Sequence, residues 1–340
     1  MTHFQEPTPL ADAKSARLVF LGTKDFALPS FEYLCRNGWQ ILALITQPDR
    51  PQGRKQQLIP SKIKCFAQAQ GIPVLQPEDL NSPEATQTLA ELRPDLLVTV
   101  AYGQILKPYI LSIAPFGGVN LHGSLLPKYR GAAPVARALE QGDLHTGVTV
   151  IQMSAQVDAG GMLAIAFTPI GPEDNALTLE AHLAEIGAPV LGEAIRNYLE
   201  GNLEPIHQDG SSASRAPKLT KEESFIDWYA PAFKVDRFIR AMNPWPLARS
   251  HFHAKSNQKS ILVMIHHSHL SDSDVKSSAE PGQIIAITKD HIEVACGDGH
   301  GVELKSIQTD GRNLLPITDW ARGMRPTVGD QFLREKRLGL

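Results

Sequence analysis

The chain has 340 residues, of which 42% are hydrophobic and 20% are charged, with a formal net charge of −3. This is ordinary globular composition, and the length predicts about two domains, each able to bury a core. No apolar run approaches the roughly 20 residues that span a bilayer. The polar first sixteen residues lack a secretory signal, so we expect a cytoplasmic protein without a membrane segment. Three widely spaced cysteines predict neither a disulfide framework nor a zinc site.

Charge is distributed unevenly along the chain. Residues 1–206 carry 15 Lys/Arg and 20 Asp/Glu, whereas residues 207–340 carry 18 and 16. This asymmetry is compatible with a C-terminal surface that meets a polyanion. Chance variation between two solvated surfaces explains it equally well.

The first half of the chain predicts a doubly wound α/β domain. Residues 1–16 read as a flexible extension, and apolar strands then alternate with helical patterns. Strands that are apolar on both faces indicate a mostly parallel, Rossmann-like sheet covered on both sides, with ligands at the carboxyl ends of the strands. The expected strands are 17–22, 41–45, 95–101, 118–122 and a short one near Val74, and the expected helices are 26–36, 61–70 and 82–92.

The second half predicts a different architecture. Residues 207–223 are rich in Ser, Ala and charge and read as a linker, and residues 225–242 read as a helix. Short β-like runs separated by Gly and Asp turns suggest a small barrel or sandwich. These runs are 261–265, 282–287, 291–295 and 302–304.

The turn after the first strand argues against a dehydrogenase. A dinucleotide site requires several glycines there, so that the backbone can approach the pyrophosphate. The segment 21–26 has only Gly22.

Two polar residues close the strand at 118–122. Asn120 and His122 stand two residues apart, so both side chains point to the same side. An amide can stabilise an oxyanion and an imidazole can move a proton near neutral pH, as acyl transfer requires. Asp158, in a Gly-rich loop after the apolar run 147–153, can reach a neighbouring strand end and stabilise a protonated His122. The alternatives are a histidine satisfied by the backbone and an aspartate that only forms a turn.

The loop at 123–131 suggests how the chemistry proceeds. It is too apolar and constrained for a solvated turn, and we expect it to line a pocket for a flat aromatic ligand. Ser124 is not surrounded by a GxSxG elbow, and no other serine or cysteine nucleophile stands beside the amide and the imidazole. The pattern therefore favours direct transfer between two bound substrates.

Three histidines near the C-terminal end invite a metal interpretation. His266, His267 and His269 are adjacent or alternate on a predicted strand and are not expected to converge on one ion. We interpret them as a solvated surface patch and predict no metal.

Several segments together resemble one enzyme family. Residues 120–134 read Asn-Leu-His-Gly-Ser-Leu-Leu-Pro-Lys-Tyr-Arg-Gly-Ala-Ala-Pro, which resembles the signature of the folate-dependent formyltransferases, and Val-Asp-Ala-Gly-Gly at 157–161 resembles that family's aspartate loop. Within this family, the chain more specifically resembles the enzymes that formylate initiator tRNA. That resemblance covers nearly all of residues 17–335. The segments that carry this narrower likeness are 46–54, 100–106, 216–223 and 240–246.

The resemblance implies a fold, two substrates and their sites. It implies a formyltransferase domain at 17–206 and an OB-like, tRNA-contacting barrel at 224–340. The donor would be 10-formyltetrahydrofolate, the acceptor would be the α-amine of methionyl initiator tRNA, and the protein would act as a monomer. Asn120, His122 and Asp158 match the family's catalytic residues. The folate site would comprise Tyr102, Gly103, Ile105, Leu106, Ser124, Leu125, Leu126, Pro127 and Val157, and the tRNA contacts Arg50, Arg54 and Lys55.

The chain departs from the family at two places, and rival functions stay open. Ala159 and Gly161 stand where the family usually has Thr and Asp, and the loop at 54–57 is less basic than is common. A formyltransferase for a sugar amine or a purine precursor shares the same centre, as does a folate hydrolase. A non-enzymatic RNA-binding module leaves Asn120 and His122 unexplained.

Overall fold

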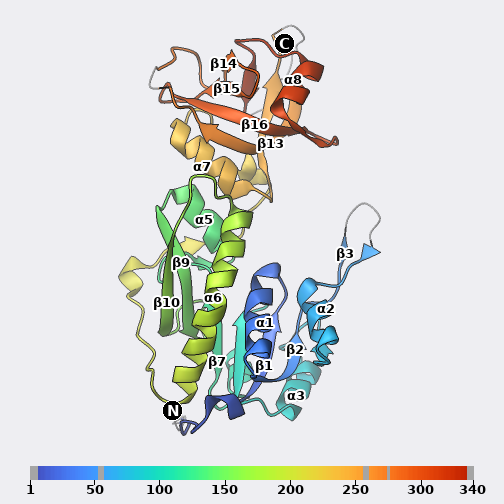
Figure 1. Cartoon of the computed structure of the whole chain (residues 1–340), viewed down its shortest axis with the longest axis vertical. Coiled ribbons are helices and arrows are strands. Elements are labelled where there is room, and N and C mark those ends of the chain that lie inside the picture. Colours follow the sequence, from blue (N-terminus) through green and yellow to red (C-terminus); the bar gives the residue numbers. More distant parts are fainter. Residues whose placement is uncertain (1–6, 53–56, 256–259, 274–275, 335–340) are drawn as a thin grey trace. The chain divides into compact units, whose positions relative to one another are not determined.

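The computed structural model describes residues 7–52, 57–255, 260–273 and 276–334 (Figure 1). The chain divides into two compact units. Unit 1 comprises Met1–Pro134, His145–Pro169 and Glu180–Ala216, and unit 2 comprises Val135–Leu144, Ile170–Leu179 and Pro217–Leu340. Two short stretches from within residues 17–206, which were predicted to form one domain, therefore belong to unit 2.

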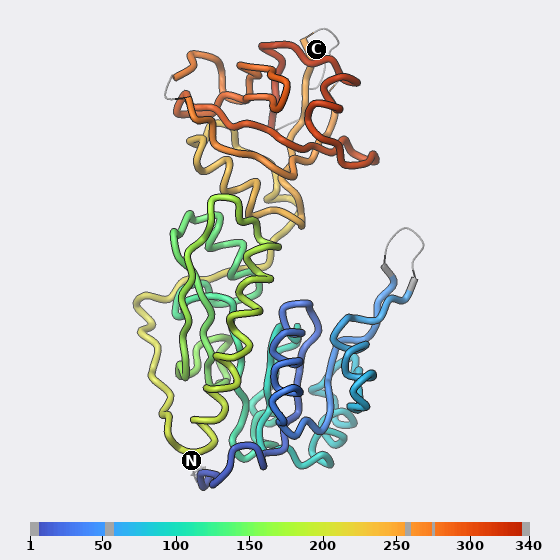
Figure 2. Tube along the Cα trace, viewed as in Figure 1, coloured from blue at the N-terminus to red at the C-terminus, as the bar shows by residue number. Residues whose placement is uncertain are grey.

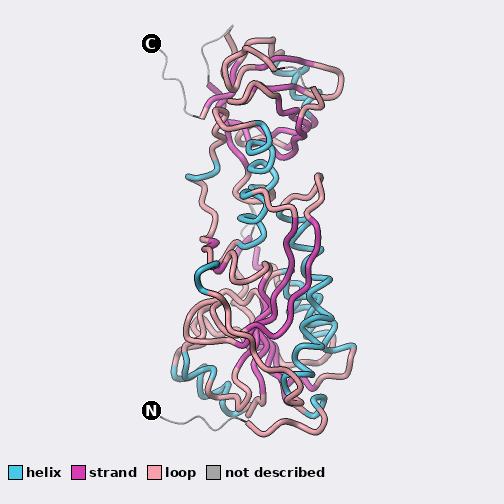
Figure 3. The backbone as a smooth tube through the Cα atoms, turned by 90° about the vertical axis from the view of Figure 1, so that its left-hand side faces the viewer, coloured by secondary structure: helices cyan, strands magenta, loops and turns pink. Residues whose placement is uncertain are grey.

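Unit 1 is built on a seven-stranded sheet with the order β10-β9-β7-β6-β1-β2-β5. The five strands from β5 to β7 are parallel, whereas β9 and β10 are antiparallel to their neighbours. Figure 3 shows helices on both sides of these strands. The predicted α/β class is confirmed. The strands are β1 (Arg17–Gly22), β2 (Gln40–Ile45), β5 (Val74–Leu75), β6 (Leu96–Val100), β7 (Gly118–His122), β9 (His145–Gln152) and β10 (Met162–Pro169).

Three helices, α1, α2 and α3, begin close to where the sequence predicts, whereas α4, α5 and α6 were not predicted. Ser61 and Ser82 cap α2 and α3, because each side chain accepts a hydrogen bond from a main-chain amide of the first turn. Pro83 then takes the first helical position, where its missing N–H costs nothing. The helices are α1 (Leu28–Arg36), α2 (Lys62–Ala69), α3 (Pro83–Glu91), α4 (Pro108–Leu111), α5 (Pro134–Gln141) and α6 (Ala176–Leu199).

The strand β10 was not predicted. Several of its residues are exposed, and Phe167 is 71% exposed. The segment therefore lacks the continuous apolar run that predicts a buried strand. It is a strand because it pairs with β9 along Met162–Pro169. Figure 2 shows the chain returning along this side after α6, and Ile206 pairs there with Met162.

The expectation of a flexible extension at 1–16 is wrong for its described part. Residues 7–16 contain the short 3-10 helix η1 (Ala13–Ser15), which Asp12 caps. Ala13 and Ala16 are fully buried, and the amide of Leu10 donates to the carbonyl of Leu199. Alanine is too small to produce a visible apolar run, although its burial still anchors the segment. Residues 1–6 lie outside the described part of the chain.

Unit 2 contains a curled antiparallel sheet with the path β14-β15-β16-β13-β12-β18, and β17 pairs with β16. Phe252, Phe332 and Trp320 pack together in its core. The predicted barrel-like domain is confirmed, although β12, β17, β18 and α8 were not predicted. The elements are α7 (Ala232–Met242), β12 (Ala248–His253), β13 (Ser260–Leu270), β14 (Ile284–Ile287), β15 (Ile292–Ala295), β16 (Gly301–Thr309), β17 (Leu314–Pro316), α8 (Ile317–Met324) and β18 (Gln331–Leu333).

Two small pairings complete the fold. The hairpin of β3 (Pro51–Gln52) and β4 (Gln57–Leu58) follows β2, and β8 (Arg130–Gly131) pairs with β11 (Arg215–Ala216). Within the described residues, no helix combines the length and apolar character that a membrane crossing requires.

Candidate active site

Asn120 and His122 lie on β7, between the parallel strand β6 and the antiparallel strand β9. Asn120 stands opposite Thr99 of β6 and Ile151 of β9, and His122 stands opposite Thr149 at the carboxyl end of the strand. The surrounding strand residues are buried, which fixes the position of this backbone. The structure therefore places both residues where ligands bind in sheets of this kind.

The two side chains are held very differently. His122 is only 6% exposed, and its Nε2 atom lies 2.9 Å from the carbonyl oxygen of Tyr129. Because a carbonyl only accepts, this nitrogen carries the hydrogen. Asn120 is half-buried, and its side-chain amide makes no hydrogen bond to any residue that the structure describes. Its donors are thus free to meet a ligand, whereas His122 is committed on one edge of its ring.

Asp158 faces the other edge of the imidazole. Its Oδ2 atom lies 3.6 Å from Nδ1 of His122 and accepts a hydrogen bond of 2.9 Å from the amide of Gly131. The Asp158 side chain is 14% exposed. A proton on Nδ1 would give an imidazolium beside a carboxylate, an arrangement that an oxyanion-stabilising histidine requires. The structure thus brings His122 and Asp158 together, and Asn120 lies two residues before His122 on the same strand.

The backbone of Asp158 is held by a residue that sequence reasoning did not assign to the site. Asp158 has a φ of 52°, a conformation that needs support from its surroundings. The Nε2 group of Gln208 donates to the carbonyls of Asp158 and Gly160, at 2.9 and 2.7 Å. Its Oε1 atom accepts from both Nε and Nη2 of Arg130. Gln208 is 2% exposed, so this small polar network is shielded from water.

Steric crowding explains why glycine occupies positions 160 and 161 in the loop of Asp158. A Cβ atom on Gly160 would stand 1.7 Å from the carbonyl oxygen of Gln152, and one on Gly161 would stand 2.4 Å from Cβ of Pro205. The departure of this chain from the family at Gly161 therefore accommodates Pro205.

The loop after β7 is fixed by residues of other segments. The hydroxyl of Thr149 donates to the carbonyl of Ser124 and accepts from the amide of Leu126. The hydroxyl of Ser214 accepts from the amide of Tyr129. Ser124 is fully buried, and its own hydroxyl donates to the carbonyl of Lys128. Its role in this structure is to close the loop.

Segment 207–216, expected to be part of a linker, is packed against this loop. It supplies Gln208 and Ser214 as well as β11, whose pairing with β8 brings Ala216 against Gly131. A Cβ atom on Gly131 would stand 2.6 Å from the carbonyl oxygen of Ala216. The segment has no hydrophobic periodicity, so its sequence does not show that it packs against this loop. Its hydrogen bonds in the structure do show it.

The predicted folate residues fall into buried and exposed groups. Tyr102 and Leu106 are buried, and burial raises the pKa of the Tyr102 phenol. Ile105 and Val157 are large apolar side chains that are 69% and 53% exposed. Gly103 has a φ of 94°, which a side chain would strain. Leu125 and Pro127 are partly exposed and Leu126 is buried.

The base of the segment at 46–58 is held by a small ionic network. The ammonium group of Lys64 donates to Asp49 and to Gln76, and the side-chain amide of Gln76 donates to the carbonyl of Gln47. The hydrogen bond from Lys64 lowers the pKa of Asp49. Farther along, Arg50 forms an exposed ion pair with Glu78. Arg54 and Lys55, the other predicted tRNA contacts, lie outside the described residues.

Comparison with known proteins places the chain in a family. Residues 16–195 match the family described as Formyl transferase, and residues 218–325 match the family described as Formyl transferase, C-terminal domain. A methionyl-tRNA formyltransferase of Pseudomonas putida (strain F1) is 42% identical over 323 residues, which are 95% of this chain and 99% of that protein. One of Pseudomonas syringae pv. tomato (strain DC3000) is 44% identical over 303 residues, 89% and 93% of the two chains.

The chain therefore belongs to the formyltransferase family, among the methionyl-tRNA formyltransferases. The resemblance inferred from residues 120–134 and 157–161 is confirmed.

The fold is also found in solved structures at low identity. WlaRD, a sugar 3N-formyltransferase, has a TM-score of 0.64 at 17% identity and covers 88% of this chain and 99% of its own. An N-formyltransferase of Helicobacter canadensis has a TM-score of 0.64 at 19% identity and covers 86% and 98%.

Proposed function

We propose that this enzyme transfers the formyl group of 10-formyltetrahydrofolate to the α-amine of methionine esterified to initiator tRNA. The observation that carries the mechanism is the grouping of an unpaired amide, an imidazole and a carboxylate at the end of β7, with Asp158 Oδ2 3.6 Å from His122 Nδ1. The similarity to methionyl-tRNA formyltransferases supports the choice of acceptor.

The proposed reaction is a direct attack. The methionyl amine attacks the formyl carbon, a carbon–nitrogen bond forms, and negative charge develops on the formyl oxygen. Asn120 donates to this oxygen through its free amide, and His122 donates through its Nδ1 edge, because its Nε2 edge is committed to Tyr129. One such donor is typically worth about 3 kcal/mol, or roughly 10²–10³ in rate.

Asp158 has two proposed roles in the same reaction. Its carboxylate stabilises the protonated imidazole of His122. It also relays the proton that the amine loses, through water, to the folate nitrogen as the bond between that nitrogen and the formyl carbon breaks. The formyl group is already activated, so the proposed reaction requires no metal.

The acceptor is bound mainly through phosphates in this proposal. Arg50, Arg54 and Lys55 contact the tRNA, and residues 224–340 form the OB-like tRNA-contacting domain. Phosphate contacts release counterions, so binding should weaken steeply with salt. The cytoplasmic location and the monomeric state stay predictions of the sequence.

A direct assay tests the proposal. The purified chain is mixed with 10-formyltetrahydrofolate and charged initiator tRNA, and formyl-methionine is measured after deacylation. Charged elongator methionine tRNA and an amino-sugar nucleotide serve as alternative acceptors, and a reaction without acceptor reports folate hydrolysis. We expect product with initiator tRNA only. Faster transfer to the sugar amine, or hydrolysis at the same rate without acceptor, would contradict the proposal.

A further inference from the structure

Unit 2 contains a cluster of potential metal ligands, none of which belongs to the candidate active site. Glu173, His267 and His269 each offer a ligand atom, and these atoms lie within 4.8 Å of one another. The two histidines belong to β13 and Glu173 lies in the stretch 170–179, all within unit 2. The cluster has no part in the proposed formyl transfer.

The expectation that these histidines do not converge is wrong for two of them. Alternate residues of a strand share a face, so His267 and His269 point the same way. The register of β13 against β16 shifts on either side of His267, and such bulges re-aim side chains. His266 is directed elsewhere, because its Nε2 atom lies 3.1 Å from Oε1 of Gln308.

The distances within the cluster match those between ligands of one metal ion. The Nε2 atoms of His267 and His269 are 3.0 Å apart, and Oε2 of Glu173 lies 3.5 and 3.1 Å from them, respectively. Zinc binds imidazole nitrogen and carboxylate oxygen at about 2.0–2.2 Å with tetrahedral geometry, which places neighbouring ligand atoms about 3.3 Å apart. The three atoms therefore have the spacing of one face of a coordination tetrahedron.

A cation satisfies this cluster better than a proton does. Two imidazole nitrogens at hydrogen-bond distance can share only one hydrogen, whereas a divalent cation accepts a lone pair from each nitrogen and from the carboxylate. The side chains of Glu173, His267 and His269 are 64%, 47% and 36% exposed. An ion can therefore enter from solvent, and water can take the remaining position.

The backbone on both sides of the cluster is held by a buried ion pair. Ser268, between the two histidines, donates to Oδ1 of Asp236, and Oδ2 of Asp236 accepts from Nε of Arg240, both at 2.9 Å. Arg240 also donates at 2.7 Å to the carbonyl of Asp174, next to Glu173. Asp236 and Arg240 are only 6% and 11% exposed. The ligands thus project from segments whose relative position is already fixed, as good metal sites require.

We propose that Glu173, His267 and His269 bind one divalent transition-metal ion of the zinc class, which joins the stretch 170–179 to β13. Two imidazoles and one carboxylate suit Zn²⁺, Co²⁺, Ni²⁺ and Cu²⁺. Mg²⁺ and Ca²⁺ prefer oxygen ligands in larger number and should not compete.

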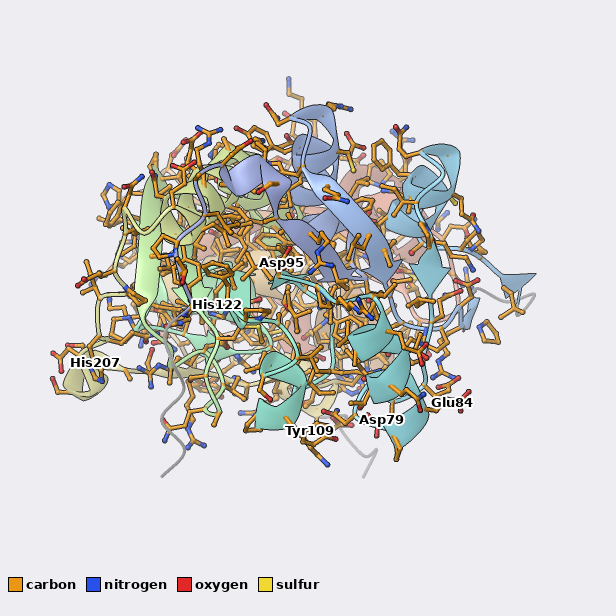
Figure 4. All side chains as sticks on the ribbon, turned by 90° about the horizontal axis from the view of Figure 1, so that it is seen from below. Asp79, Glu84, Asp95, Tyr109, His122 and His207 are labelled. Carbon is orange, nitrogen blue, oxygen red and sulfur yellow. The ribbon has the colours of Figure 1, made fainter. Side chains whose placement is uncertain are left out.

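Calorimetric titration of the full chain with zinc chloride, after removal of metals with a chelator, tests the site. We expect one ion per chain. Substitutions of outer groups around a metal commonly cost 10- to 100-fold in affinity, so loss of a direct ligand in His267→Gln, His269→Gln or Glu173→Gln should cost at least about tenfold. His266→Gln, on the same strand, and His207→Gln, at the periphery of unit 1, are matched controls that should bind like the parent chain (Figure 4).

Thermal unfolding separates loss of the site from loss of the fold. Zinc should raise the Tm of the parent chain, whereas the double variant His267→Gln/His269→Gln should keep the parent's metal-free Tm and show no rise with zinc. An excess of Mg²⁺ should leave the zinc titration unchanged. Absence of zinc binding to the parent chain, or undiminished binding to the double variant, overturns the proposal.

Discussion

Two loops of unit 1 follow the carboxyl ends of parallel strands and differ in how they are held. The loop after β7 is fixed by Thr149 and Ser214, which bond to its main chain, and by Gln208, which accepts from the side chain of Arg130. In the segment after β2, the ionic network around Lys64 fixes the base, and the described residues beyond it, such as Arg50 and Leu58, are exposed. Preorganisation lowers the cost of reaching a transition state, whereas an exposed basic segment contributes binding. The first loop should therefore control turnover and the second should control affinity for tRNA.

The largest effect is expected from Asp158→Asn. The substitution keeps the shape of the side chain but removes the charge that faces His122 Nδ1 at 3.6 Å. By analogy with the aspartate of a Ser-His-Asp centre, kcat should fall about 10³- to 10⁴-fold. Single-turnover kinetics measure the step, and the Tm should stay close to that of the parent. Near-normal turnover would remove Asp158 from the mechanism.

Asn120→Ala should cause the second largest fall in kcat. The variant removes the unpaired amide proposed to donate to the developing oxyanion, so kcat should fall about 10²- to 10³-fold. The KM for folate and for tRNA should change little, because the interaction strengthens only in the transition state. A variant that raises KM but keeps kcat would instead assign Asn120 to ground-state binding.

Gln208→Glu tests whether the loop acts through its fixed geometry. The variant keeps the acceptor that faces Arg130 but places a carboxylate against the carbonyls of Asp158 and Gly160. Displacement of the Asp158 backbone should lower kcat about 10- to 100-fold with little change in KM. Gln156→Glu, an exposed change in the same loop, is the control. An unchanged kcat in Gln208→Glu would make Gln208 a purely structural residue.

Changes in the basic segment should affect binding instead. Arg50→Ala and Arg54→Ala should each raise the KM for tRNA a few-fold, leave folate binding unchanged, and reduce the slope of log affinity against log salt by about 1. Arg36→Ala is the matched control, because Arg36 is also an exposed arginine paired with a glutamate. Equal losses of folate and tRNA binding would contradict the division between the two loops.

The smallest effect on activity is expected from a substitution at the amino ends of the parallel strands, opposite the ends that carry the candidate active site. Asp95 accepts hydrogen bonds from the main chain and the guanidinium of Arg17, and the Arg17 side chain lowers the pKa of Asp95. Asp95→Asn should cost about 1 kcal/mol of unfolding free energy and leave kcat unchanged.

The same pair predicts a pH dependence of stability. A lowered pKa in the folded state contributes stability that is present above the unfolded pKa of about 4 and is lost as pH falls through the folded value. The unfolding free energy of the parent should therefore decrease more than that of Asp95→Asn between about pH 5 and pH 2. Denaturant titrations at several pH values measure this, and parallel curves would contradict it.

The strands of the parallel sheet could be predicted from the sequence because they are buried on both faces. Continuous apolar runs such as 17–22 and 96–100 have few other interpretations. Asn120 and His122 could be predicted as neighbours because a strand projects alternate side chains to one side. β10 and residues 7–16 were missed, because their places depend on pairing with β9 and on burial of small alanines.

By itself, the sequence determined the α/β class, the barrel-like second domain, the family, and the amide and imidazole at the end of β7. These features depend on local periodicity and on motifs contiguous in the chain. Only the tertiary structure decided that Gln208 holds the loop of Asp158, and that Glu173 lies against His267 and His269. Such contacts join residues far apart in the chain, and their partners are selected by packing and hydrogen bonding, which leave no periodic trace in the sequence.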